Sequence, residues 1–163
     1  MLSMLIIWGV GLANAQSVIE PFVLGREPQT FFNVGWTAGA SLAETSGIFA
    51  GGTAGVSRIT GNQWVGATAD ILLDTGSGLN LMVGPKVGLL VLGVDAGFAA
   101  RSDFRNPIVT GGYGRAEVNL GVVSWYYRAV VWPVESALST THQLGVSMKF
   151  PQQLGYKPRV VYR

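Results

Sequence analysis

The segment TFFNVGWTAGASL, residues 30–42, alternates apolar side chains with small or polar ones. Successive side chains of a β-strand point to opposite faces, so this period of two predicts a strand with one apolar and one polar face. The apolar face carries Phe32, Val34, Trp36, Ala38, Ala40 and Leu42. The other face carries Phe31, Asn33, Gly35, Thr37, Gly39 and Ser41.

The same alternation recurs in seven further segments of about ten residues each, separated by turn-prone stretches. They cover residues 48–60, 64–74, 79–89, 93–101, 108–120, 123–131 and 143–150. Eight strands are an even number, which lets an antiparallel sheet close with both chain ends on one side. The sequence therefore predicts an all-β, eight-stranded, up-and-down β-barrel.

Two connections are harder to place than the others. Residues 90–92 contain no turn residue, so we expect a sharp bend somewhere between Gly88 and Gly93. Residues 132–140 contain Pro133 and no regular alternation, and we expect the longest loop there.

The composition favours a membrane rather than water around this barrel. Charged residues make up 12% of the 163-residue chain, against roughly 25% in an ordinary soluble domain, and 48% of residues are hydrophobic. A helical membrane span needs about 18 or more apolar residues in a row. The best candidate, residues 79–100, is interrupted by Pro85, Lys86 and Asp95. Basic residues are dispersed at a net charge of +2, so nucleic-acid binding has no support.

A lipocalin-like soluble barrel would also show alternating side chains, with apolar residues inside and charged residues outside. The composition of the polar face distinguishes it from a transmembrane barrel. Here that face holds mainly Gly, Ser, Thr and Asn, a poor aqueous surface but a workable narrow lumen. We expect its charges to form a salt-bridged plug, because unpaired buried charges are costly. These are Asp70, Lys86, Asp95, Arg115, Glu117, Arg128 and Lys149. A gated pore lined by the same residues remains the alternative.

Aromatic residues lie near the ends of several segments, where the interface belts of membrane proteins occur. They are Phe31, Phe32, Trp64, Phe98, Trp125, Trp132 and Phe150. The alternative is that they fill the core of a soluble barrel.

The N-terminus has the pattern of a secretory signal peptide. Residues 1–15, MLSMLIIWGVGLANA, are apolar and close on Ala13-Asn14-Ala15, an A-x-A cleavage box. We expect cleavage after Ala15, leaving residues 16–29 as a periplasmic segment before the barrel. The leading part lacks Lys and Arg, and a buried helix or an uncleaved anchor is the alternative.

The last strand carries Gln143, Gly145, Met148 and Phe150 at the spacing of the C-terminal assembly signal of outer-membrane proteins. With the eight segments, this makes the chain resemble the small barrels of the OmpA-barrel and OmpX type over residues 30–150. The resemblance implies a transmembrane barrel in the lipids of a bacterial outer membrane, inserted by the barrel-assembly machinery. It does not imply an activity.

The chain departs from that family by continuing past Phe150. Residues 151–163 carry Lys157, Arg159 and Arg163 and no acid. This basic tail is either a solvated end or a periplasmic docking segment for a protein of the cell envelope.

Catalytic and cofactor motifs are weak. The chain has no cysteine and one histidine, His142, near Ser139 and Glu135. Outer-membrane lipid A deacylases have a serine two residues after the histidine, where this chain has Leu144. We therefore expect no cofactor and a structural or partner-binding role. The alternatives are a narrow, porin-like pore and a lipid A-modifying enzyme.

Overall fold

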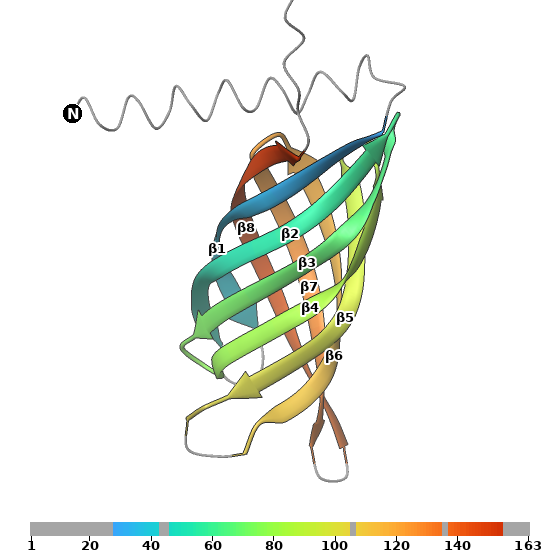
Figure 1. The fold of residues 1–163 in the computed structure, drawn as a ribbon. Coiled ribbons are helices and arrows are strands. Elements are labelled where there is room, and N and C mark those ends of the chain that lie inside the picture. Colours follow the sequence, from blue (N-terminus) through green and yellow to red (C-terminus); the bar gives the residue numbers. More distant parts are fainter. Residues whose placement is uncertain (1–27, 43–45, 105–106, 135–136, 155–163) are drawn as a thin grey trace, which may run out of the picture.

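The computed structural model describes residues 28–42, 46–104, 107–134 and 137–154, and these form a closed β-barrel (Figure 1). Each strand pairs antiparallel with its neighbours in sequence, and β8 closes the barrel against β1. The strands wind obliquely around the axis (Figure 1). Their bounds are β1 Gln29–Leu42, β2 Gly47–Thr60, β3 Gln63–Asp74, β4 Gly78–Leu89, β5 Leu92–Ser102, β6 Val109–Leu120, β7 Val123–Val134 and β8 Ala137–Leu154. The up-and-down, eight-stranded barrel is confirmed.

The two rims of the barrel differ. Thr30 pairs with Leu154, so the described chain enters and leaves the barrel at one rim, which we call the terminal rim. Two-residue turns at 61–62, 90–91 and 121–122 complete it. The opposite strand ends form the second rim, which we call the loop rim and which includes the turn at 75–77. The described residues include no helix that is long and apolar enough to cross a membrane.

The turn at residues 90–91 forms without turn residues. Leu90 has a φ of 54°, in the left-handed region that Gly61 (58°) and Gly121 (70°) occupy at the first position of the other two terminal-rim turns. Tertiary contacts hold it there. The Leu90 N–H donates to the Asn62 carbonyl oxygen at 2.7 Å, and the Leu90 carbonyl accepts a 3.1 Å hydrogen bond from the Trp64 indole.

Two boundaries differ from those that the sequence pattern predicts. The prediction of a long loop over residues 132–140 is wrong, because β7 and β8 remain paired as far as Val134 and Ala137, and Pro133 pairs with Leu138. Pro133 lies next to the end of β7, where a missing N–H disturbs few ladder hydrogen bonds. The last strand also continues past Phe150 to Leu154, where its final residues pair with the start of β1. The barrel therefore includes part of the predicted tail.

The barrel is polar inside and apolar outside. Of the eleven Asp, Glu, Lys and Arg residues that the structure describes, all but Arg58, Arg101 and Asp103 are buried. The buried set of described residues contains 18 polar or charged side chains and 11 hydrophobic ones. Large apolar side chains cover the outer wall instead, with Trp36 50% and Trp125 59% exposed. A soluble barrel would have the opposite arrangement.

Candidate functional site

A cluster of ion pairs crosses the middle of the barrel interior. Arg115 of β6 lies at its centre, 2.6 Å from the Asp95 carboxylate of β5 and 2.9 Å from that of Asp70 in β3. The same Asp70 oxygen accepts a hydrogen bond from Arg128 of β7. Glu117 contributes a longer contact to Arg115, at 3.7 Å. Side chains from four strands are thus tied together across the lumen.

Strand register explains why two arginines meet here. Arg115 is paired directly with Asp95 on one side and with Arg128 on the other. The two guanidinium groups would repel each other in the interior, and Asp70 lies between them as a shared partner. The face of the Tyr126 ring adds a second neutralising surface, 5.4 Å from the Arg115 guanidinium and 5.0 Å from that of Arg128.

A second ion pair lies toward the terminal rim. The Lys149 ammonium of β8 is 3.0 Å from a Glu117 carboxylate oxygen, and the other Glu117 oxygen accepts a 3.0 Å hydrogen bond from the Asn119 amide. Ser124 in turn donates to the Asn119 amide oxygen at 2.6 Å. Glu117 therefore has a partner at each of its oxygens.

Large side chains fill the interior between the ion-pair cluster and the loop rim. We call this group the loop-side cluster. It consists of Phe49, Leu72, Met82, Ala99, Tyr113, Tyr126, Val130 and Trp132. Leu72 and Val130 have no exposed surface, and Trp132 is 1% exposed.

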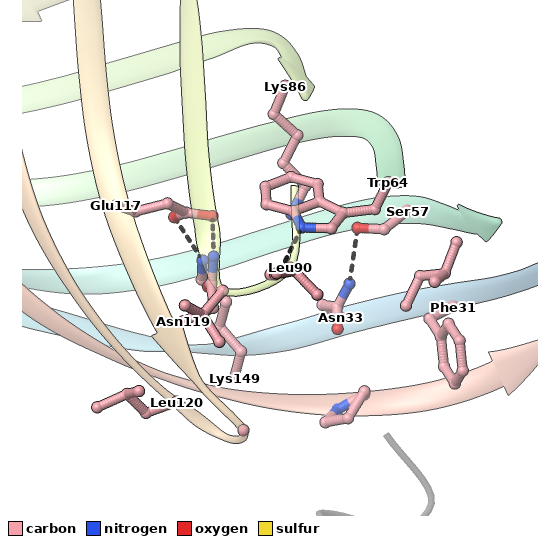
Figure 2. Close-up of a pocket in the computed structure, with 14 residues that line it drawn as sticks. Phe31, Asn33, Ser57, Trp64, Lys86, Leu90, Glu117, Asn119, Leu120 and Lys149 are labelled. Atoms are coloured by element: carbon pink, nitrogen blue, oxygen red, sulfur yellow. Dashed lines mark hydrogen bonds and ion pairs between the residues drawn. The ribbon is translucent and has the colours of Figure 1, made fainter. Parts of the chain in front are cut away.

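The interior is hollow on the other side of the ion pairs. A cavity of about 470 Å³ lies at the terminal rim, and we call it the terminal cavity (Figure 2). Its apolar lining comes from Phe31, Ile59, Trp64, Leu90, Val91, Leu120, Gly121 and Pro151. Its polar lining comes from Asn33, Ser57, Lys86, Glu117, Asn119 and Lys149.

The position of the Trp64 indole keeps this cavity open. The ring lies against Gly88 of β4 and Gly93 of β5, where a Cβ atom would come within 2.1 and 2.4 Å of ring atoms. Any larger residue at these positions would displace the ring. The indole also donates to the Leu90 carbonyl, which anchors its outer edge (Figure 2).

Lys86 differs from the other charges of the interior. It is 6% exposed, and its ammonium lies 5.2 Å from the centre of the Trp64 ring. Within the described part of the chain no carboxylate comes within salt-bridge distance of it. The structure therefore brings six of the seven predicted lumen charges into ion pairs and places Lys86 in the cavity wall instead.

Three of the aromatic residues assigned to interface belts are placed inside the barrel. Phe31, Trp64 and Trp132 are 2%, 6% and 1% exposed, so the belt assignment is wrong for them. The alternation along each strand could have predicted this inward placement, because Phe31 shares its face with Asn33, and Trp64 shares its face with Asp70. The sequence analysis did not predict that Phe31 and Trp64 line a cavity together with three of the predicted lumen charges. Phe32, Phe98 and Trp125 do lie on the outer wall.

The predicted assembly-signal residues divide between the two faces of β8. Gln143 is buried and accepts a 3.2 Å hydrogen bond from Arg128, and Gly145 lies beneath the Tyr126 ring. Met148 and Phe150 are half-buried on the outer face. The predicted signal peptide at residues 1–15 and the tail cations Lys157, Arg159 and Arg163 lie outside the described residues.

The one histidine lies on the outer wall. His142 Nδ1 is 2.5 Å from the Tyr127 hydroxyl, and the two rings stack 5.9 Å apart. Ser139 pairs across the strands with Trp132, and Glu135 lies outside the described residues. The described part of the chain contains no group of His, Asp and Glu side chains that could hold a metal ion. No protein-family model, curated protein or solved structure gives a significant match to this chain.

Proposed function

We propose that this protein is an integral β-barrel of a bacterial outer membrane, with a structural or partner-binding role in the cell envelope. The observation that carries the proposal is the inverted distribution of polarity: buried charges and an exposed apolar wall. An apolar wall of this extent is stable in lipid and prone to aggregation in water. Closure of the sheet leaves no unpaired strand edge for lipid to meet.

Strand length and rim geometry also support a membrane location. The strands are 11–18 residues long, and about 9–11 tilted residues suffice to cross a bilayer. The terminal rim has only two-residue turns, as the periplasmic rims of such barrels do. We therefore orient the terminal rim and its cavity toward the periplasm.

The filled interior favours a closed barrel over a pore. The ion-pair cluster and the loop-side cluster together occupy the lumen from its middle to the loop rim, and Arg128 has no exposed surface. Eight strands leave room for little more than side chains. We expect no conductance in planar bilayers.

Outer-membrane extraction followed by electrophoresis tests the location. We expect the protein to sediment with outer membranes, to require detergent for extraction, and to run faster unheated than boiled, because the folded barrel binds less of the gel detergent. A protein that stays in the aqueous fraction, with a single mobility, would contradict the proposal.

The partner-binding role can be tested on the basic tail. Truncation should begin at residue 155, since β8 needs Pro151 and Leu154 for its pairing with β1. We expect envelope proteins that co-purify with the full chain to be lost from the truncated one. A matched variant with Lys157, Arg159 and Arg163 changed to Gln tests whether charge is responsible. An unchanged set of partners in both variants would exclude docking through the tail.

A further inference from the structure

The terminal cavity combines an apolar lining with a buried cation. We propose that it binds a long-chain carboxylate, such as a fatty acid, with the carboxylate at Lys86 and the acyl chain along the apolar lining. The cavity volume of about 470 Å³ falls within the range of small-ligand sites, which are mostly apolar with a few placed polar groups. The proposal concerns the barrel interior, and its tests rest on the proposed membrane location because they use the barrel folded in vesicles.

The charge balance of the cavity favours an anion. Lys86, Lys149 and Glu117 line it, and Glu117 already has Lys149 and Asn119 as partners. One positive charge therefore remains, on the Lys86 ammonium. The Lys86 ammonium lies beside an aromatic ring and has no salt-bridge partner among the described residues, so its burial is incompletely compensated, and a carboxylate would supply a charge-assisted hydrogen bond.

The apolar part of the cavity lies between this charge and the terminal rim. Leu90 and Leu120 are about half exposed there, at 46% and 59%, and the buried Phe31 and Pro151 belong to the same lining. A ligand that enters headgroup first would place its polar end at Lys86 and its apolar chain among these side chains. A short polar anion such as phosphate would leave that lining uncovered, so the lining favours an amphiphile.

Backbone hydrogen bonds between neighbouring turns hold the mouth of the cavity in shape. Asn119 N–H donates to the Val91 carbonyl at 2.7 Å, and Lys149 N–H donates to the Val122 carbonyl at 2.8 Å. With the hydrogen bond from Leu90 to Asn62, each terminal-rim turn is joined to the next strand or turn. The site is therefore preorganised, which lowers the entropic cost of binding.

Trp64 provides a direct readout of occupancy because its ring forms part of the wall. In a variant that keeps Trp64 and has Phe at the other four tryptophans, folded in phosphatidylcholine vesicles, 9,10-dibromostearate should quench the fluorescence saturably. Excess stearate should restore it. The matching variant that keeps only Trp132, behind the ion-pair cluster, should not be quenched. Absence of saturable quenching of Trp64 would overturn the proposal.

Lys86→Met tests the charge, and Arg58→Met is its control on the outer face of the same rim. We expect Lys86→Met to weaken dibromostearate binding by about tenfold or more, with little change for the uncharged 9,10-dibromooctadecanol. Arg58→Met should bind both ligands as the parent does. Equal binding of the acid by the parent and by a folded Lys86→Met protein would overturn the assignment of the headgroup.

If Lys86→Met does not fold, as judged by its unheated gel mobility, a second variant tests whether the ligand binds in the terminal cavity. Ser57→Phe places a ring in the cavity and keeps Lys86. We expect it to abolish saturable quenching of Trp64, whereas unchanged quenching would show that the ligand binds elsewhere. Failure of any of these tests would leave the membrane proposal intact, because that proposal depends on the outer wall.

Discussion

The two ends of the barrel interior are enclosed by the same eight strands and are filled differently. Toward the loop rim, Leu72, Met82 and Trp132 pack into a cluster with almost no exposed surface. Toward the terminal rim, Trp64 lies flat against two glycines and leaves a cavity. The eight strands therefore determine the shape of the barrel wall. The size and direction of the inward side chains determine whether a given part of the lumen is filled or hollow.

The ion-pair cluster separates the two ends, and its loss should have the largest effect. Arg115→Ala leaves Asp70 and Asp95 buried with fewer partners, and we expect it to lower the free energy of unfolding by about 3–5 kcal/mol. Urea unfolding in lipid vesicles, followed by gel mobility, measures this. Arg58→Ala, on the outer face, should change it by less than about 0.5 kcal/mol. Similar losses in both variants would show that the cluster does not stabilise the barrel.

Truncating one side chain at each end tests the contrast between them. Leu72→Ala opens a void in a filled region, and we expect a loss of about 2–5 kcal/mol in the same assay. Ile59→Ala removes as many carbon atoms from the wall of an existing cavity, where little new void is created, and we expect a loss below about 2 kcal/mol. Equal losses would mean that the terminal end is packed as tightly as the loop end.

The Leu90 turn gives the smallest expected effect, with the opposite sign. Leu90→Gly relieves a left-handed backbone conformation that disfavours a Cβ atom, and we expect the free energy of unfolding to rise by about 1 kcal/mol. Leu89→Gly, in the adjacent strand, should lower it by about 0.5–1 kcal/mol. A loss of stability in Leu90→Gly would indicate that the leucine side chain itself secures the turn.

Alternation alone was sufficient to predict the barrel and the charges of its lumen. A period of two assigns each residue to a face, and all seven predicted lumen charges are buried. It could not predict which charges pair, because that depends on register between strands far apart in the sequence. Lys86 sits opposite Asp95 in the ladder, yet Asp95 contacts Arg115 instead.

The features that the sequence did not reveal arise from tertiary contacts. The turn at residues 90–91 has no local signal and is held by the carbonyl of Asn62 and the indole of Trp64. The terminal cavity depends on Gly88 and Gly93, which come together across two strands beneath one ring. The pairing of β7 with β8 beyond residue 131 was not predicted. In the sequence, Pro133 suggests the end of a strand, whereas in the structure it lies near the end of β7 and still pairs with Leu138.

Quenching by brominated phosphatidylcholine, measured in four single-tryptophan variants, compares the outer wall with the interior in one experiment. Trp36 and Trp125 are 50% and 59% exposed on the outer wall, whereas Trp64 and Trp132 are 6% and 1% exposed inside. For a barrel that lies in lipid we predict strong quenching of Trp36 and Trp125 and little of Trp64 and Trp132. Unquenched Trp36 and Trp125, or equal quenching of all four, would contradict an inside-out barrel in a membrane.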